Sequence, residues 1–362
     1  MPILSHAGVA QPGAILPVHE VVAIVRQWVD QHARHWPDFA GAYLWGGITA
    51  LPADAPFPLY RDVDVVVVLA TDTPADEQEV FFGGLSLEVI TKSLAEHHDA
   101  PAVLANPSAG PNVATTQILA DPTGILGTLQ RAVAADYGRR RWVQARCAAE
   151  QAAADAGLAA MRRATTPAER LNAVRDVLMA LSGLLAVAEL RRPTTRRTLA
   201  LMHELLVAYG RADLQEIALA VMGSAAMDVA AVERLLEQTI ATFDRAAAVN
   251  RTPIPYGFAI QPHLRPYYLE GTREMIDQDL HREAVFWIAC LDTVYFVLEN
   301  DAPAAEKAGF ASQLRDLYDA LGYTSAAAWG ARVAAAEGLA AEISQLADAS
   351  AALHPDQASI AE

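Results

Sequence analysis

The strongest constraint that this sequence places on its fold is a run of valines. Residues 63–69 read Val-Asp-Val-Val-Val-Val-Leu, so five of the seven residues are β-branched. Such residues favour extended backbone, and an apolar run of this kind is typical of a strand buried on both faces. The sequence therefore predicts a sheet that is covered from both sides at this strand.

The rest of the first third of the chain predicts further strands and one helix. In residues 85–91, Leu85, Leu87 and Val89 alternate with other side chains, as in a strand with one apolar face. The remaining expectations are a helix over residues 17–35, a strand over residues 41–45 and a loop over residues 106–112, where proline and glycine gather.

Composition changes near residue 138, after which alanine and leucine recur with helical spacing. Thr166-Pro167-Ala168-Glu169 forms a capping box with proline at the first helical position, which predicts a helix start. The helices expected are residues 125–135, 139–164, 166–190, 195–209, 213–221, 228–247, 271–299, 303–321 and 325–347. We therefore expect the α+β class: a small mixed β-sheet domain over residues 1–138, an all-helical domain over residues 139–350 and a frayed tail over residues 351–362.

Charge and composition limit the partners of the chain. The 362 residues carry a formal net charge of −16, which repels nucleic acid over most of the surface and attracts small cations. The most apolar stretch, residues 177–190, is too short to span a bilayer. The N-terminus does not resemble a signal peptide, and Cys147 and Cys290 are too far apart to suggest a disulfide framework. We expect a cytoplasmic protein without membrane or nucleic-acid partners.

One set of acidic residues has the spacing of a metal site. Asp62 and Asp64 are two apart at the start of the valine strand, so both side chains point to the same face. Glu88 lies on the next predicted strand and can complete the cluster. Carboxylate oxygens are ligands that Mg²⁺ prefers, and three close carboxylates would raise one another's pKa unless a metal ion neutralised them.

These residues form part of a longer pattern. Leu44-Trp45-Gly46-Gly47 is followed by fourteen residues, then by Asp62-Val63-Asp64 and later by Leu87-Glu88-Val89. The pattern resembles the signature of the nucleotidyltransferase superfamily, and within it most resembles the kanamycin- and lincosamide-type antibiotic nucleotidyltransferases and the minimal nucleotidyltransferases. The resemblance covers roughly residues 40–92, and Gly47 stands where many relatives have serine.

The resemblance implies a reaction and a set of roles. Asp62 and Asp64 would bind two Mg²⁺ ions, Glu88 would support the ion on the nucleophile side, and Gly46 and Gly47 would cradle the phosphates of an NTP, by default ATP. Residues 1–138 would be the catalytic domain and residues 139–350 would bind the acceptor. The chain would transfer a nucleoside monophosphate to a hydroxyl group of a small, cationic, aminoglycoside-like acceptor and release pyrophosphate.

Other site residues are suggested by position. Arg61 and Lys92 flank the motif residues and are candidates for contacting the triphosphate. A hydroxyl acceptor needs a general base. The candidates are the acidic residues of the predicted helix over residues 271–299, which also carries aromatic side chains that could line an acceptor pocket: Asp279, Glu283 and Asp292.

Two alternatives stay open. The first is a toxin–antitoxin component that nucleotidylates a protein or a tRNA, although the acidic charge disfavours tRNA. The second is a non-catalytic module that senses nucleotides, although an intact set of three carboxylates disfavours it. The sequence leaves open the identity of the acceptor and the NTP, and whether the chain forms a homodimer.

Overall fold

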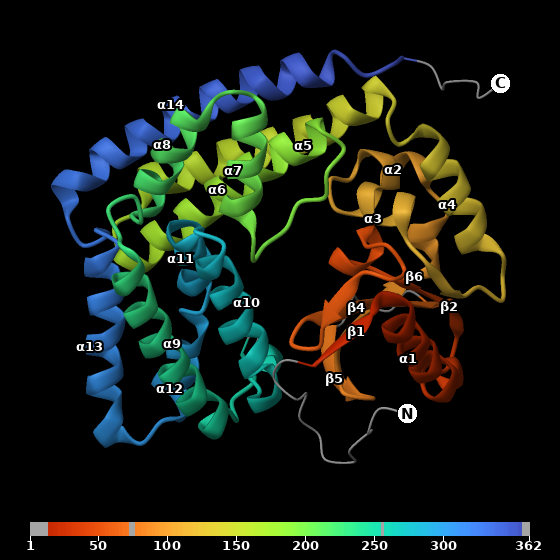
Figure 1. The fold of residues 1–362 in the computed structure, drawn as a ribbon, viewed down its shortest axis with the longest axis horizontal. Coiled ribbons are helices and arrows are strands. Elements are labelled where there is room, and N and C mark those ends of the chain that lie inside the picture. Colours follow the sequence, from red (N-terminus) through yellow and green to blue (C-terminus); the bar gives the residue numbers. More distant parts are fainter. Residues whose placement is uncertain (1–13, 72–76, 255–256, 357–362) are drawn as a thin grey trace. The chain divides into compact units, whose positions relative to one another are not determined.

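The computed structural model describes residues 14–71, 77–254 and 257–356 (Figure 1). These residues form two compact units. The first unit comprises the residues up to Tyr137 together with His263–Gly271, and the second comprises Gly138–Pro262 and the residues from Thr272 onward. All described strands lie in the first unit, and the second is helical. The predicted α+β class is confirmed.

The first unit is built on a five-stranded sheet with the order β5-β6-β4-β2-β7. The central strand β4 runs parallel to β6, whereas the other neighbouring pairs are antiparallel, so the sheet is mixed. The strand bounds are β2 Phe39–Leu44, β4 Asp62–Leu69, β5 Glu77–Phe82, β6 Leu85–Ser93 and β7 Ile118–Ala120. The short strands β1 (Ile15–Pro17) and β3 (Pro56–Pro58) form a separate pair.

The valine strand is buried on both faces, as predicted. Val63, Val65 and Val67 belong to the core beneath α1 (Val18–Gln31). Val66 and Val68 belong to a smaller core that includes Leu126 of α4 (Ile125–Asp136). Because alternate strand residues point to opposite faces, Asp62 and Asp64 share the face of this smaller core.

The prediction of a loop over residues 106–112 is correct for residues 106–108 and wrong for residues 109–112, which are helical. Helix α2 (Ala100–Ala105) leads into α3 (Ala109–Thr115). The Asn106 side chain accepts hydrogen bonds from the N–H groups of Ser108 and Ala109 at 2.9 and 2.8 Å. Gly110 and Pro111 occupy the first turn of α3, where a missing proline N–H costs no helical hydrogen bond.

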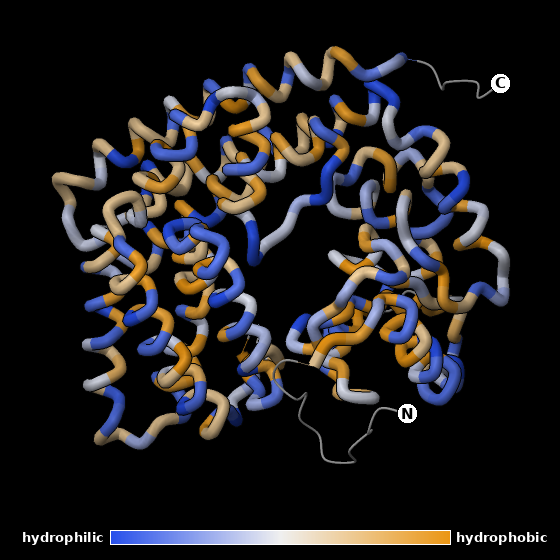
Figure 2. The backbone as a smooth tube through the Cα atoms, viewed as in Figure 1, coloured by the Kyte–Doolittle hydropathy of each residue, from blue (hydrophilic) through white to orange (hydrophobic). Residues whose placement is uncertain are grey.

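The second unit consists of helices packed around a shared core, and Figure 2 shows hydrophobic and hydrophilic residues alternating along them. The helices are α5 Arg140–Arg163, α6 Pro167–Ala188, α7 Thr198–Ala208, α8 Ala212–Met222, α9 Val229–Val249, α11 His281–Cys290, α12 Thr293–Asp301, α13 Ala304–Ala320 and α14 Ala326–Ala351. Helix α10 (Arg265–Asp277) begins among the residues of the first unit and ends in the second.

The predicted start of α6 is confirmed by its hydrogen bonds. The Thr166 hydroxyl accepts from the Glu169 N–H at 3.2 Å, and the Glu169 carboxylate accepts from the Thr166 N–H at 3.0 Å. By length and composition α6 is the one described helix that could cross a membrane, but 78% of its most apolar window is buried within the structure. That burial is characteristic of a core helix.

The single helix predicted over residues 271–299 is three helices, α10, α11 and α12. The first break lies at Asp279, which adopts a left-handed conformation with φ 61° after the end of α10. The Leu280 N–H then donates to the Met275 carbonyl at 2.9 Å, which closes the helix end. Aspartate tolerates this conformation better than most residues.

The segment expected to be a frayed tail begins inside α14 and continues against α5 and α6. Arg140 donates its N–H to the Pro355 carbonyl at 2.8 Å and its Nε to the His354 carbonyl at 2.9 Å. The His354 Nε2 lies 2.7 Å from the Ala188 carbonyl. Residues 357–362 of this segment lie outside the described residues.

Candidate metal centre

The three carboxylates singled out in the sequence lie together on one face of the sheet. In the parallel register of β4 and β6, Asp64 is directly opposite Glu88, and Asp62 is opposite Ser86. One carboxylate oxygen from each of Asp62, Asp64 and Glu88 lies within 4.8 Å of the others, and all three side chains are half-buried. We call these residues the acidic triad.

The edge strand β5 extends this cluster. Glu79 is directly opposite Glu88 in the antiparallel register, so a row of three carboxylates crosses three adjacent strands. The Ser86 hydroxyl donates a hydrogen bond to Glu79. The sequence reading missed Glu79, because residues 77–82 lack a clear strand pattern. The available signal was Glu77 and Glu79 two residues apart, just before Val80-Phe81-Phe82.

The closeness of these carboxylates affects the pKa of two of them, Glu88 and Glu79. Burial, together with the smaller effect of the nearby charges of Asp62, Glu79 and Glu77, raises the pKa of Glu88 to about 8. Burial also raises the pKa of Glu79 to about 7, where the hydrogen bond from Ser86 opposes the rise and the charge of Asp62 adds to it. A cation bound between these groups would remove the repulsion.

The residues present fit a hard divalent cation. The acidic triad offers only oxygen atoms, which suit Mg²⁺, Mn²⁺ or Ca²⁺ better than the softer metals that take nitrogen and sulfur ligands. Two of the three side chains come from one strand and the third from its parallel neighbour, so the ligands are held on a rigid, buried scaffold. The triad can therefore bind and orient a cation that itself contacts anionic oxygen atoms of a substrate.

The turn after β2 closes against Asp64. Gly46 has φ 70°, and a Cβ atom added to it would lie 1.5 Å from the Asp64 Oδ2, so no other residue fits. The Gly46 carbonyl accepts a hydrogen bond from the Thr49 hydroxyl at 3.1 Å. A Cβ atom on Gly47 would meet nothing within 4 Å. The two glycines of the motif are therefore constrained very differently.

Asn112 of α3 holds this turn in place. Its side chain is 2% exposed, its Oδ1 accepts from the Gly46 N–H at 2.9 Å, and its Nδ2 donates to the Ser108 carbonyl at 2.9 Å. By contrast, the N–H groups of Gly47 and Ile48, at the start of the short helix η2 (Gly47–Ala50), donate to no group in the described part of the chain. The sequence did not predict this role of Asn112, because its segment was expected to be a loop.

The two basic residues proposed for phosphate contact lie in different places. Arg61 immediately precedes Asp62 at the start of β4. Lys92 lies four residues beyond Glu88 on β6, which is roughly 13 Å along a strand. Its Nζ is 5.0 Å from the centre of the Trp45 ring and 3.9 Å from Glu96. The structure thus places Arg61 beside the triad in the chain and Lys92 at the far end of the same face.

The three candidates for a general base lie in the second unit. Glu283 is 4% exposed and accepts a hydrogen bond from the Gln215 side chain at 2.9 Å. Asp292 is 5% exposed and forms an ion pair of 2.8 Å with Arg175. Asp279 is exposed and occupies the turn between α10 and α11. Glu283 and Asp292 therefore have partners within the helical unit.

Comparison with known proteins gives little further information. No family model matches the chain, and no curated protein matches it either. A solved structure, described as a nucleotidyltransferase-like protein from Exiguobacterium sibiricum 255-15, aligns over 81% of this chain and 89% of its own length, with 14% identity and a TM-score of 0.29. At this level of similarity, the function has to be inferred from the site itself.

Proposed function

We propose that the chain is a metal-dependent nucleotidyltransferase that transfers a nucleoside monophosphate from an NTP, by default ATP, to a hydroxyl group of a small acceptor. The observation that supports this most is the acidic triad on two parallel strands, with Gly46 packed directly against Asp64. The triad supplies oxygen ligands at one point, and the turn supplies backbone that a phosphate can approach closely.

In this reaction the acceptor oxygen attacks the α-phosphorus, and the bond from the α-phosphorus to the bridging oxygen of the β-phosphate breaks. Pyrophosphate leaves, and the hydroxyl proton passes to a base, for which Asp279, Glu283 and Asp292 are the candidates. Two bound Mg²⁺ ions would neutralise charge on the attacking and leaving oxygens. Asp62 and Asp64 would hold both ions, and Glu88 the one on the side of the acceptor.

The other residues of the turn and strand would hold the donor. Gly46 allows the triphosphate to approach the strand end, and the N–H groups of Gly47 and Ile48 point to no described partner, so they can donate to phosphate oxygens. Arg61, the residue before Asp62, would add a positive charge at the same end of β4. Asn112 would fix the turn through the Gly46 N–H.

For the acceptor we propose a small cationic molecule of the aminoglycoside type. The net charge of −16 attracts such a molecule electrostatically. The same charge disfavours tRNA. The motif resemblance to antibiotic nucleotidyltransferases points to the same class of acceptor.

The test is mass spectrometry of pooled small-molecule acceptors incubated with the full chain, Mg²⁺ and each NTP in turn. We expect one acceptor to gain the mass of one nucleoside monophosphate, and the Asp62→Asn variant to lose this activity. Asp54→Asn is the matched control, because its side chain is 95% exposed and lies outside the triad.

The other outcomes separate the alternatives. Release of pyrophosphate in a cell extract, without modification of any small molecule, would redirect the proposal to protein or RNA acceptors. Binding of NTP without any turnover would favour a nucleotide sensor. Turnover that Asp62→Asn leaves unchanged would contradict the assignment of the site.

A further inference from the structure

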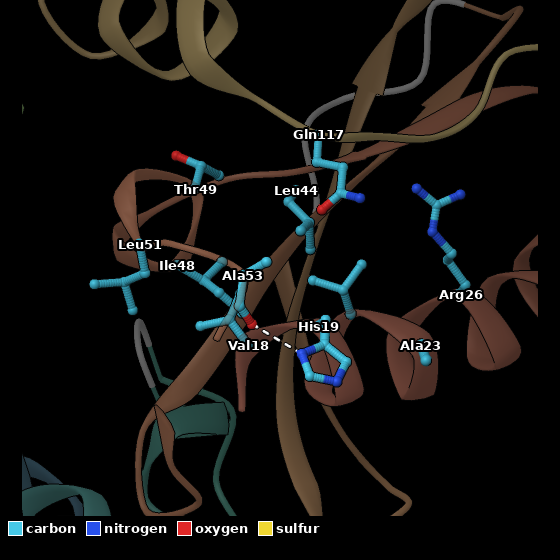
Figure 3. Close-up of a pocket in the computed structure, with 11 residues that line it drawn as sticks. Val18, His19, Ala23, Arg26, Leu44, Ile48, Thr49, Leu51, Ala53 and Gln117 are labelled. Atoms are coloured by element: carbon cyan, nitrogen blue, oxygen red, sulfur yellow. Dashed lines mark hydrogen bonds between the residues drawn. The ribbon is translucent and has the colours of Figure 1, made fainter. Parts of the chain in front are cut away.

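A hollow, whose lining is drawn in Figure 3, lies on the face of the sheet that α1 covers, opposite the face that carries the acidic triad. It has a volume of about 280 Å³ and is bordered by α1, the end of β2, the turn that contains η2, and Gln117. Its apolar wall is continuous with the core beneath α1, since Val22, Leu44 and Ile48 belong to both. This volume is just below the usual range for small-molecule sites, so only a small ligand would fit.

One side of the hollow is polar. Figure 3 shows the Arg26 guanidinium and the Gln117 amide on the same side of the hollow, with the apolar side chains below and beside them. In the described part of the chain, the single side-chain hydrogen bond of Arg26 runs from Nη2 to the Ile118 carbonyl at 3.3 Å. The Gln117 side chain has no hydrogen bond to any described residue.

The charge of the lining sets the hollow apart from the rest of the protein. No aspartate or glutamate is among the lining residues, although the chain as a whole carries a net charge of −16. His19 also borders the hollow, and its Nδ1 lies 3.0 Å from the Ala53 carbonyl and 3.4 Å from the carboxylate of Asp54, which is 95% exposed and is not a lining residue. A positive group and a neutral amide therefore face a space with apolar walls.

We propose that this hollow binds a small carboxylate with an apolar body, such as a short-chain or aromatic carboxylic acid. Guanidinium and carboxylate are both planar and can form two parallel hydrogen bonds. The Gln117 amide can donate a further one. The apolar body of the ligand would lie against the accessible apolar lining residues Ala23, Leu51 and Ala53. A phosphate dianion fits less well, because a single guanidinium meets few of its oxygens and the apolar wall meets none.

The hollow shares Ile48 with the turn proposed to hold the donor but contains no residue of the acidic triad, so carboxylate binding can be measured directly and without turnover. We would titrate the full chain with sodium benzoate and sodium hexanoate by NMR or calorimetry, beside the neutral analogues benzamide and hexanamide and inorganic phosphate. We expect saturable binding of at least one carboxylate with a stoichiometry of one. Its neutral analogue should bind about tenfold more weakly or worse, because the charge-assisted hydrogen bonds are lost.

Two variants and a matched control locate the binding. Arg26→Gln should weaken carboxylate binding about tenfold or more. Ala23→Phe should block it by filling the space, and because Ala23 is an exposed lining residue the larger side chain leaves the core unchanged. Arg34→Gln removes an arginine that is 51% exposed and pairs with Asp30, and it should bind as the wild type does.

Three results would overturn the proposal. The first is the absence of saturable carboxylate binding at millimolar concentrations. The second is carboxylate binding that neither Arg26→Gln nor Ala23→Phe weakens. The third is tighter binding of inorganic phosphate than of either carboxylate. Thermal denaturation of each variant would verify that it is folded, and Ala23→Phe keeps the test decisive if Arg26→Gln does not fold.

Discussion

Both units bury carboxylates, but they surround them with different neighbours. In the helical unit Asp292 pairs with Arg175 and Glu283 accepts from Gln215. In the sheet unit the charges that act on Glu88 come from Asp62, Glu79 and Glu77, and each of them raises its pKa. The first arrangement supplies its own partners, whereas the second places like charges side by side.

This difference leads to different predictions for the two sets of acidic residues. A buried carboxylate with an arginine partner is part of the native packing, and the protein loses stability when either partner is removed. A row of carboxylates costs stability unless a ligand brings positive charge, and this arrangement is therefore compatible with a bound cation. The sequence predicted the acidic triad from its spacing and the candidate bases from their position in a helix that carries aromatic residues, and the surroundings of the two sets differ in the structure.

The largest effect should come from Asp64→Asn. We expect Mg²⁺-dependent nucleotidyl transfer, followed as pyrophosphate release, to fall on the order of 10³-fold or more, because an ion ligand at the reacting phosphate is lost. In the absence of metal the same variant should be more stable than the wild type, because it relieves repulsion within the triad. Unchanged activity together with lower stability in the absence of metal would contradict the proposal that the triad binds metal and costs stability without it.

Asp292→Asn should, in contrast, affect the stability of the protein more than its activity. We expect the free energy of unfolding in urea to fall by up to about 3 kcal/mol, because Arg175, whose side chain is 18% exposed, loses its counter-charge. The control is Asp213→Asn, which removes an exposed partner of Arg211 and should leave stability nearly unchanged. If Asp292→Asn abolished turnover without loss of stability, Asp292 would instead be the general base.

The parts of the fold that depend on local pattern could be predicted from the sequence. The valine run identifies β4, and the spacing of Asp62 and Asp64 places both on one face. The capping box at Thr166 identifies the start of α6. These features depend on neighbours in the chain, which a single sequence displays directly.

The parts of the fold that depend on contacts between distant residues could not be predicted from the sequence. Glu79 joins the acidic row only through the pairing of β5 with β6, and β5 has no strong strand pattern of its own. Asn112 lies in a segment rich in proline, glycine and asparagine, and its role requires the contact with Gly46, 66 residues earlier. The break at Asp279 was missed because an aspartate in left-handed conformation is one of several residues that end a helix.

The next largest effect should be a difference between substitutions of the two glycines of the motif. Gly46→Ala should destabilise the chain by about 1–3 kcal/mol, because its φ of 70° is unfavourable for alanine and the new Cβ atom would displace Asp64. It should also weaken Mg²⁺ binding, measured by calorimetry. Gly47→Ala should do neither, since its Cβ atom would enter open space. Equal effects of the two substitutions would contradict the close approach of Gly46 to Asp64.

The smallest effect is the pH dependence of metal-free stability, because the triad is only half-buried and salt screens its charges. The pKa of Glu88 is about 8 in the folded chain, against an ordinary value of 4.5. Between these pH values the folded chain holds a proton that the unfolded chain has released, so stability falls as pH rises and levels off above about 8.

Glu88→Gln cannot ionise and should flatten this decline in urea unfolding from pH 5 to pH 9 with EDTA present. Saturating Mg²⁺ should flatten it in the wild type, since the ion competes with the proton. A wild-type decline that neither Mg²⁺ nor the substitution alters would mean that the repulsion lies elsewhere.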